Sequence, residues 1–251
     1  MAQGHRLVRV AGLMRADAPD DPSARERGSV DAALQASSLY RFFRAGDEET
    51  LALQGVSIRL DAGELVAVVG PSGSGKSTLL SCLAGLDEPD GGTVRVAGWR
   101  ISHQPEPIRA RLRARRIGLL LQTGNLFSHL SVAQNVDMAQ QLANGRPADR
   151  ADVAELLESL GIADRAHAKP DELSGGESAR AGLAVALAND PVVLLADEPT
   201  GELDAVTEQQ VLALLRARAN AGVAILIASH SPAVARAADR VISLSDGRIA
   251  A

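Results

Sequence analysis

Cysteine and aromatic residues are scarce in this sequence of 251 residues. The only cysteine is Cys82, which excludes a disulfide framework or a cysteine-rich metal site within one chain and fits a reducing compartment. Phe, Trp and Tyr together make up 2% of the residues, so we expect an aliphatic core. A stacking platform for single-stranded nucleic acid is not expected either, because such platforms are built from aromatic rings.

Long hydrophobic runs are also missing. The longest apolar runs, counting glycine, are the eight residues at 181–188 and at 221–228, whereas a transmembrane helix needs roughly 18. No apolar segment of the kind found in secretory signals follows the basic residues near the N-terminus. We therefore expect a chain that does not span a membrane by itself and carries no secretory signal.

The sequence has no excess of positive charge. It contains 26 Lys and Arg against 31 Asp and Glu, which gives a formal net charge of −5. This balance provides no whole-chain electrostatic basis for binding duplex DNA or RNA, and we expect no nucleic-acid partner. With 46% hydrophobic and 23% charged residues, the composition is that of an ordinary globular protein.

Two parts of the chain differ in pattern. Residues 1–29 include a polar, proline-containing and aperiodic stretch, and we interpret them as a flexible N-terminal extension. From about residue 30 predicted strands alternate with predicted helices, which favours an α/β fold over residues 30–251. Only helical patterns occur between Gln122 and Ala188, so we expect an inserted helical subdomain at about 123–188.

Short apolar runs predict a parallel sheet, since strands that are buried on both faces read as continuous apolar segments. A period-two strand is expected at 56–60, and the apolar runs are at 65–69, 117–121, 192–196 and 223–228. Helical patterns occur at 77–83, 131–144, 149–160, 179–188 and 205–219. Ser131 begins one helix with a capping-box pattern, and Gly161 closes another.

A phosphate-binding loop is predicted between the strand at 65–69 and the helix at 77–83. Residues Gly70–Ser77 match G-x-x-x-x-G-K-[ST] in the strand–loop–helix context that the motif requires. Glycines let backbone N–H groups surround phosphate oxygens, and the helix N-terminus adds partial positive charge. Lys76 would reach the β- and γ-phosphates, and Ser77 would hold Mg²⁺. A glycine-rich turn that only caps a helix is the alternative.

Two carboxylates follow the apolar run at 192–196. Asp197 and Glu198 stand at the carboxyl end of a predicted buried strand, where α/β sheets bind ligands. Asp197 would reach Mg²⁺ directly or through water, and Glu198 would polarise an attacking water. Taken alone, the pair would rather fit a solvated turn stopped by Pro199, but the phosphate loop elsewhere in the chain favours the catalytic interpretation.

A second helix start contains unexpected glycines. Ser174 and Glu177 form a capping-box pattern around Gly175 and Gly176. Glycines in a first turn weaken a helix by about 1 kcal/mol each, so a simple cap would not need them. They do let another group approach the backbone closely. Two helix N-termini suited to phosphate indicate one nucleotide held between two copies of the chain, in a symmetric dimer.

Together these segments resemble the ATP-binding cassette (ABC) ATPase family. Gly70–Ser77 resembles its Walker A sequence, Val192–Glu198 its Walker B sequence and Leu173–Glu177 its signature sequence. Four further features occur in the family's order and resemble the A-loop aromatic residue, the Q-loop glutamine, the D-loop and the switch histidine: Tyr40, Gln122, Gly201–Asp204 and His230. The resemblance implies a RecA-like P-loop NTPase core with an antiparallel β segment and an inserted helical subdomain.

The resemblance also implies a Mg²⁺-dependent ATPase with ATP and Mg²⁺ as cofactors. The residues that would bind ATP are Tyr40, Gly70, Pro71, Ser72, Gly73, Ser74, Gly75, Lys76, Ser77, Thr78, Ser174, Gly175, Gly176, Glu177 and Asp204. The metal residues would be Ser77, Gln122 and Asp197, and the catalytic residues Glu198, His230 and Gln122. Because Ser174 and Gly176 would bind the γ-phosphate held by the opposite subunit, ATP would close a head-to-tail homodimer and hydrolysis would open it.

Partners and location follow from the same resemblance. The chain would energise transport through separate transmembrane permease subunits at the cytoplasmic face of the membrane. The segments Gln122–Val136 and Pro199–Asp204 are similar to the lipoprotein-release and macrolide-export group. One alternative is a soluble ABC ATPase that acts on nucleic acid or ribosomes. Another is a weakly active regulatory module, because Ala179, Val185 and Glu202 depart from the family's pattern.

Overall fold

Two β-sheets form the framework of the structure. The computed structural model describes residues 32–45, 48–145 and 149–250, so the extension predicted at 1–29 lies outside the described residues. One sheet has the strand order β2-β1-β4-β5, and the other has the order β10-β9-β3-β8-β7-β6. The strands are β1 (Ala32–Ala45), β2 (Glu48–Asp61), β3 (Leu65–Val69), β4 (Gly91–Val96), β5 (Trp99–Arg100), β6 (Ile117–Leu120), β7 (Val193–Asp197), β8 (Ala224–Ala228), β9 (Arg240–Ser245) and β10 (Arg248–Ile249).

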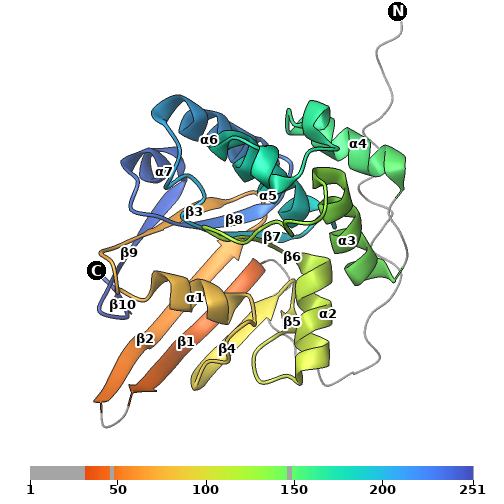
Figure 1. Ribbon diagram of the computed structural model, residues 1–251. Helices are drawn as coiled ribbons and strands as arrows, with labels where there is room; N and C mark the ends of the chain where they lie inside the picture. Colours follow the sequence, from red (N-terminus) through yellow and green to blue (C-terminus); the bar gives the residue numbers. More distant parts are fainter. Residues whose placement is uncertain (1–31, 46–47, 146–148, 251) are drawn as a thin grey trace, which may run out of the picture.

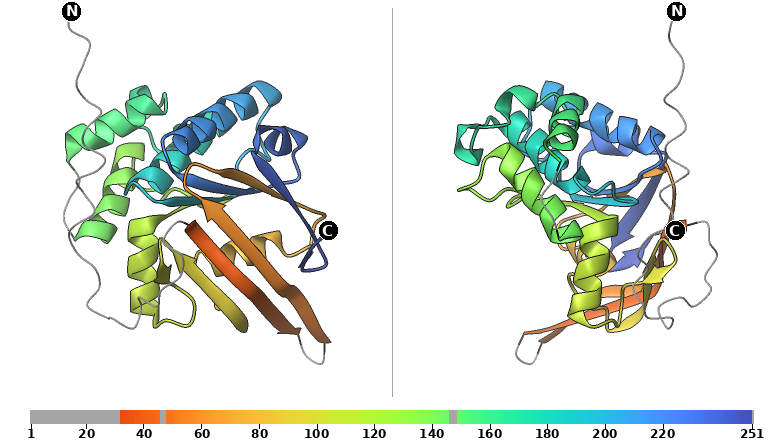
Figure 2. Two further views of the ribbon diagram at one scale, coloured as in Figure 1. Left: turned by 180° about the vertical axis from the view of Figure 1, so that it is seen from behind. Right: turned by 90° about the vertical axis from the view of Figure 1, so that its right-hand side faces the viewer.

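Helices cover both faces of the six-stranded sheet. They are α1 (Lys76–Leu83), α2 (Glu106–Arg116), α3 (Val132–Asn144), α4 (Arg150–Ser159), α5 (Gly175–Leu187), α6 (Ala205–Asn220) and α7 (Pro232–Ala237). In Figure 1 this sheet crosses the middle of the molecule, with α5, α6 and α7 on one face and α1 on the other. The four-stranded sheet lies beyond α1, and the views in Figure 2 show the same layers.

The central sheet separates two aliphatic cores, as its strand sequences predict. Val66 and Val68 of β3 face the core that contains α1 and the four-stranded sheet. Leu65 and Ala67 face the core formed by α3 to α7. Cys82 lies fully buried in the first core, where burial raises the pKa of its thiol to about 12.

The predicted parallel sheet is confirmed by the pairing of β6 with β7, β7 with β8, β8 with β3, and β3 with β9. The carboxyl ends of these strands therefore meet at one edge. The segments that follow them carry the predicted site: Gly70–Ser77 after β3, Gln122 after β6, Glu198 after β7 and His230 after β8. This edge is where open α/β sheets bind their ligands.

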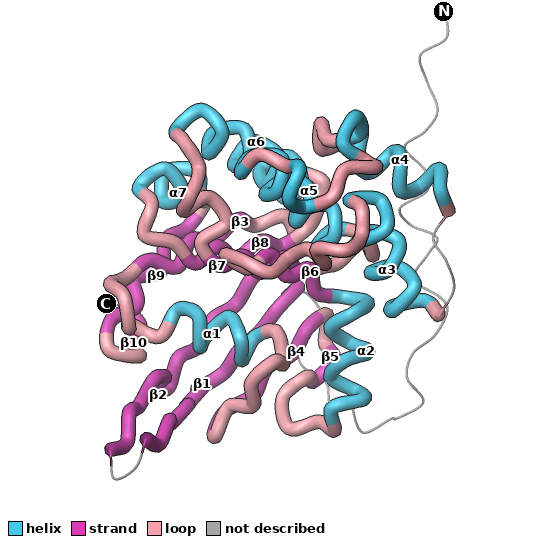
Figure 3. Tube along the Cα trace, viewed as in Figure 1, coloured by secondary structure: helices cyan, strands magenta, loops and turns pink. Residues whose placement is uncertain are grey.

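Between β6 and β7, the described residues form helices and turns without a strand, as Figure 3 shows by colour. The segment contains α3, α4, α5 and two short 3₁₀ helices. Ser131 and Ser174 both form the capping boxes that the sequence predicts, and Gly161 takes a left-handed φ of 65° after α4. None of the helices in the described ranges combines the length and apolar character needed to cross a bilayer.

Candidate functional site

The loop between β3 and α1 is held tightly by backbone groups of other strands. Gly75 has a left-handed φ of 103°, and a Cβ there would lie 2.5 Å from the carbonyl oxygen of Ala52 in β2. A Cβ on Gly70 would lie 2.1 Å from the carbonyl oxygen of Leu244 in β9. Both positions therefore require glycine, because neighbouring backbone occupies the space of a side chain. The structure explains these glycines by close packing of the loop.

Lys76 is the first residue of α1 and turns its ammonium group back onto the loop. Its Nζ donates hydrogen bonds to the carbonyl oxygens of Gly70 at 2.8 Å and Pro71 at 3.0 Å. The first turn of α1 contains no acidic residue. A cation, free N–H groups and the positive end of a helix dipole thus lie together. The loop has the charge and donors that a phosphate group needs.

The outer part of this loop is open to solvent. Ser72, Gly73 and Ser77 are exposed, while Thr78 is partly buried and Ser74 is buried. The Gly247 N–H donates to the carbonyl oxygen of Ser74 at 3.1 Å and anchors the inner part of the loop. A ligand can therefore reach the loop from the side of Ser72 and Ser77.

Glu198 and His230, predicted as catalytic residues, are brought together by the structure. His230 Nδ1 lies 2.7 Å from Glu198 Oε1, and the His230 backbone N–H donates to the same oxygen at 3.1 Å. The Glu198 side chain is 14% exposed and the His230 side chain 74% exposed. The carboxylate is thus held near the surface, with an exposed imidazole beside it.

Ser229 is a member of this site that sequence reasoning did not identify. Its hydroxyl donates to Glu198 Oε2 at 2.7 Å, and the residue is fully buried. It directly follows β8, which pairs with β7, so the two strand ends hold serine and glutamate side by side. No local pattern distinguishes such a serine, because the contact depends on strand order.

Three residues offer oxygen atoms at the carboxyl edge of the sheet: Ser77, Gln122 and Asp197. Within the described residues, no cluster of three or more His, Cys, Asp or Glu could hold a metal ion alone. A hydroxyl, an amide and a carboxylate are hard oxygen donors, and Mg²⁺ in nucleotide sites is commonly bound by a few such groups plus phosphates and water. The donor set fits a magnesium ion that arrives with a nucleotide.

The turn that carries Gln122 is fixed by an asparagine. Asn125 Oδ1 accepts from the Leu121 N–H at 2.8 Å, and Asn125 Nδ2 donates to the Leu121 carbonyl at 2.6 Å. A Cβ on Gly182 in α5 would lie 3.1 Å from Asn125 Cβ, so the turn packs against that helix. The Gln122 side chain is exposed beside this anchored turn.

The predicted signature residues form the exposed start of α5. The Glu177 N–H donates to Ser174 Oγ at 3.3 Å, and the Ser174 N–H donates to Glu177 Oε2 at 2.8 Å. Arg165 Nε donates to Glu177 Oε1 at 2.7 Å. The Ser174 N–H first, and then Arg165, lower the pKa of Glu177 to about 2. Ser174 and Gly175 are exposed, so a second molecule can reach them.

The predicted D-loop residue Asp204 acts as the N-cap of α6. Its carboxylate accepts from the Val206 N–H at 2.9 Å and from the Thr207 hydroxyl at 2.6 Å. The Thr207 hydroxyl, followed by backbone N–H groups, lowers the pKa of Asp204. A Cβ on Gly176 would lie 2.5 Å from Thr207 Cγ2, so the start of α6 packs tightly on the signature helix.

Tyr40, the predicted adenine-stacking residue, lies against two glycines of the four-stranded sheet. A Cβ on Gly55 would be 3.0 Å from the Tyr40 hydroxyl, and one on Gly91 would be 3.5 Å from its ring. Tyr40 pairs with Gly91 of β4. Gly91 and the buried Val94 are three residues apart in this strand, so they lie on opposite faces of the sheet. The tyrosine ring therefore lies on the outer face of this sheet, away from α1.

Phe43 lies on the other face of β1. The guanidinium of Arg41 lies 4.8 Å from the centre of the Phe43 ring, which places both side chains on one face. Arg41 also pairs with Asp87, just beyond the end of α1, at 2.8 Å. The Phe43 side chain is 42% exposed. An exposed aromatic ring thus stands on the face of the sheet that α1 covers.

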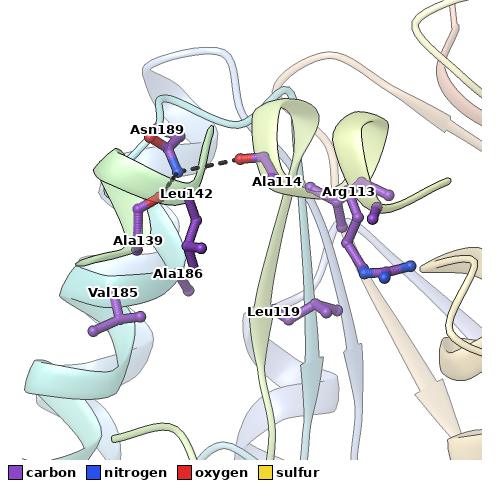
Figure 4. Close-up of a pocket in the computed structure, with 10 residues that line it drawn as sticks. Arg113, Ala114, Leu119, Ala139, Leu142, Val185, Ala186 and Asn189 are labelled. Carbon is purple, nitrogen blue, oxygen red and sulfur yellow. Dashed lines mark hydrogen bonds between the residues drawn. The ribbon is translucent and has the colours of Figure 1, made fainter. Parts of the chain in front are cut away.

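A groove separates α2 from α3 and α5 (Figure 4). Asn189 bridges its two sides, because its Nδ2 donates to the carbonyl oxygens of Ala114 in α2 and Ala139 in α3 at 3.1 and 3.0 Å. Leu142 and Val185 contribute apolar surface, and Leu142 is 74% exposed. The groove is largely apolar and open to a partner segment.

Comparison with known proteins finds similarity to ABC transporter proteins. A family model described as ABC transporter matches residues 53–201. The macrolide export ATP-binding/permease protein MacB of Salmonella typhi is 42% identical over 221 residues, which cover 88% of this chain and 34% of that protein. MacB 1 of Yersinia pseudotuberculosis gives the same identity and coverage. The chain spans about a third of the length of these curated relatives.

Solved cassettes share the fold. The dimeric structure of MJ0796, described as a bacterial ABC transporter cassette, is 32% identical, has a TM-score of 0.80 and covers 87% of this chain and 97% of that one. A post-hydrolysis state of the same cassette, bound to ADP and Pi, has a TM-score of 0.81 at 31% identity and the same coverage. The two sheets and the helical segment described above thus have solved counterparts.

Proposed function

Because this chain belongs to the ABC transporter family, we propose that it binds and hydrolyses ATP to energise transport through transmembrane permease partners. The observation that carries the proposal is the Glu198 carboxylate, held by Ser229 and His230 at the sheet edge that also carries the Lys76 loop. Its relatives named above include a cassette bound to ADP and Pi, which supports hydrolysis by the same kind of site.

In this proposal the loop Gly70–Thr78 cradles the phosphates of ATP. The Lys76 ammonium exchanges its carbonyl partners for phosphate oxygens, and backbone N–H groups at the start of α1 complete the cradle. Ser77, Gln122 and Asp197 would hold Mg²⁺, which supplies charge neutralisation to the phosphates when bound. These residues bind and orient the nucleotide.

Glu198 would act as the general base that orients and polarises the attacking water. Its carboxylate accepts bonds from Ser229 and His230, so its orientation is fixed before the nucleotide binds. A positioned base of this kind contributes typically about 10²–10⁴-fold to rate. His230, largely exposed beside it, would contact the γ-phosphate and hold the carboxylate in place.

The nucleotide base would stack on Phe43. Tyr40 was the residue suggested by sequence order, but its ring rests on Gly55 and Gly91 at the outer face of the sheet. Phe43 and Arg41 instead stand on the face toward α1, where the phosphate loop begins that helix. An adenine ring could pack against this exposed aromatic side chain.

The site would be completed by a second copy of the chain. Ser174 and Gly175 are exposed at the start of α5, with N–H groups available to an anion. The dimeric form of the MJ0796 cassette supports a homodimer in which each signature segment contacts ATP bound by the other copy.

The permease would occupy the apolar groove between α2 and α3, which would place the cassette at the membrane surface. The similarity to MacB supports a role in export, with a macrolide-type substrate as one candidate.

Replacing Glu198 by Gln tests the function. The variant should retain ATP binding but lose at least 100-fold in turnover, because the amide cannot accept a proton. Phosphate release in the presence of Mg²⁺ measures the rate, and fluorescent-nucleotide titration measures binding. Glu155→Gln, on the exposed surface of α4, serves as the matched control. Unchanged turnover in Glu198→Gln would refute the catalytic assignment, and binding without any hydrolysis in the native chain with its permease would favour a regulatory module.

A further inference from the structure

A single carboxylate connects the segment after β7 with the segment after β8. Glu208 lies in the first turn of α6, and its Oε1 accepts two hydroxyl hydrogen bonds. One comes from Thr200 Oγ1 at 3.0 Å, immediately before the D-loop. The other comes from Ser231 Oγ at 2.7 Å, immediately after the switch histidine. The same oxygen atom therefore holds both segments.

The connection continues to the proposed general base. The Ser231 N–H donates to Ser229 Oγ at 3.1 Å, and the Ser229 hydroxyl donates to Glu198 Oε2 at 2.7 Å. Thr200 and Ser229 are 3% and 0% exposed, so water cannot readily replace a lost partner. Removing one member of a buried hydrogen-bond network leaves its neighbours unsatisfied. The orientation of Glu198 thus depends on groups that Glu208 holds.

Capping of α6 does not account for Glu208. Asp204 already caps this helix by accepting from the N–H groups of Val206 and Thr207. Glu208 instead directs its carboxylate toward hydroxyl groups outside the helix, and hydrogen bonds to a charged acceptor are roughly twice as strong as neutral ones. Its neighbour Thr207 contacts Gly176 of the signature helix. The first turn of α6 therefore touches the D-loop, the switch segment and the signature helix.

We propose that Glu208 is a positioning residue that couples the D-loop to the catalytic carboxylate of the same chain. Contact of the D-loop with a second copy would act on Thr200, and Glu208 would transmit the displacement through Ser231 and Ser229 to Glu198. The proposal rests on the proposed function, because it assumes that Glu198 catalyses hydrolysis in a dimer. In this proposal, Glu208 makes the correct orientation of the Glu198 carboxylate depend on contact between the D-loop and the second copy.

The test measures ATP turnover, KM and the Hill coefficient of Glu208→Ala, Glu208→Gln, Thr200→Val and Ser231→Ala. Glu208→Ala removes both hydroxyl contacts, so it should lower kcat at least about tenfold and leave KM within about twofold. The Hill coefficient should fall toward 1, because the site no longer responds to the other copy. Glu208→Gln, which keeps an acceptor oxygen, should recover part of kcat. Gln209→Ala, exposed on the same helix, is the control.

One double variant tests whether Thr200 and Glu208 act through the same connection, as a positioning role requires, or lower activity independently through a general loss of stability. Thr200→Val combined with Glu208→Ala should be no slower than Glu208→Ala alone, because both remove the same connection. Normal kcat and Hill coefficient in Glu208→Ala, or fully additive effects, would overturn the proposal. If Glu208→Ala does not fold, Thr200→Val and Glu208→Gln decide the question by the same readouts. Glu198→Gln is measured in parallel: if it abolishes turnover while the Glu208 variants remain normal, the inference fails and the proposed function stands.

Discussion

Glu198 combines an uncommon backbone conformation with a fully engaged side chain. Its φ is +46°, in the left-handed region that residues with a Cβ rarely adopt. Such a conformation costs on the order of 1 kcal/mol and persists only when the surroundings enforce it. Here the Glu198 N–H donates to the Ala228 carbonyl at 2.9 Å, while Ser229 and His230 hold the carboxylate. The strained turn aims one oxygen of the carboxylate at an exposed imidazole.

Glu177 should titrate far below an ordinary glutamate. The Ser174 N–H and the Arg165 guanidinium stabilise its charged form, and they lower its pKa from 4.5 to about 2. The sign follows from linkage: the stabilisation is complete above about pH 4.5 and is lost as pH falls toward 2. Arg165→Ala should raise the pKa of Glu177 toward its ordinary value. NMR titration of the Glu177 side-chain carboxyl measures its pKa in the native chain and in the variant. An unchanged pKa in Arg165→Ala would contradict the role given to Arg165.

Most residues of the site could be predicted from the sequence, because they belong to contiguous motifs. Lys76, Glu198 and Ser174 follow directly from the phosphate loop, the strand end and the glycine-containing cap. Ser229 and Glu208 could not be found in this way, since Ser229 bonds a residue 31 positions away and one of the two partners of Glu208 lies 23 positions away. Sequence order suggests Tyr40 as the stacking aromatic residue, whereas the proposal above uses Phe43. Only the alternation of β1 shows that Phe43, and not Tyr40, shares the face of Arg41.

Among the elements, the buried strands were the most predictable. The run at 65–69 coincides with β3. Strand β7 begins and ends one residue later than the run at 192–196, and β8 begins one residue later than the run at 223–228. Continuous aliphatic runs suffice because both faces of these strands are covered. Helix α5 begins at Gly175, directly after Ser174, as the capping box predicts, and it ends at Leu187, one residue before the end of the apolar pattern at 179–188. The capping box of Ser174 and Glu177 compensates for the glycines.

Helix α2 was missed for a physical reason. Its sequence is rich in arginine, and Leu112 is its one buried residue. The apolar stripe of α2 is therefore narrow, with Ile108 partly buried beside Leu112, and the helix is stabilised by contacts that only the fold supplies. Arg113 donates to the carbonyl oxygen of Gly85 at 2.9 Å and to Glu106 at 2.8 Å, while Arg109 pairs with Glu88 at 2.8 Å.

The contact between α5 and α6 should be sensitive to one methyl group. In Gly176→Ala the new Cβ would lie 2.5 Å from Thr207 Cγ2, so the helices must separate. Such overpacking costs about 1–3 kcal/mol, and calorimetry should show a lower Tm together with reduced ATP turnover. Thr207→Ser removes Cγ2 but keeps the hydroxyl that bonds Asp204, so it should restore both properties in the double variant.

Gly175→Ala is the matched control for this prediction. A Cβ at Gly175 would lie 3.5 Å from Leu203 Cδ2, an ordinary van der Waals distance. Its effect on Tm should therefore be smaller than that of Gly176→Ala. Equal effects of the two substitutions, or a failure of Thr207→Ser to rescue, would show that the close approach of the two helices is not what requires glycine.

At the scale of the whole molecule, each chain presents two separate surfaces for one nucleotide. The phosphate loop opens at Ser72 and Ser77, and the signature segment is exposed at Ser174. Two such surfaces on one chain suit a two-fold dimer, in which each copy contributes one of them to either site. Sequence alone suggested this arrangement from the pair of helix N-termini, and the exposure of both segments is compatible with it.

ATP should therefore assemble the dimer, and Ser174 should be needed for assembly. In the Glu198→Gln background, light scattering after size exclusion should give twice the monomer mass with ATP and the monomer mass with ADP. Adding Ser174→Arg should block dimer formation. The Kd of the monomer for the nucleotide should stay within about threefold, because the phosphate loop of that chain is unchanged. Glu158→Arg, exposed on α4, is the control. A dimer that forms equally well with Ser174→Arg would exclude the shared-nucleotide arrangement.

The buried position of Cys82 has a practical consequence for following this assembly. Its thiol is sealed in the aliphatic core with a pKa near 12, so maleimide and nitroxide reagents should find no reactive thiolate in the folded chain. A cysteine introduced at an exposed site such as Asp164 would then be the unique point of attachment, without removal of the native one. Spin or fluorophore pairs on two copies could record the approach of the subunits during turnover in the otherwise unaltered protein.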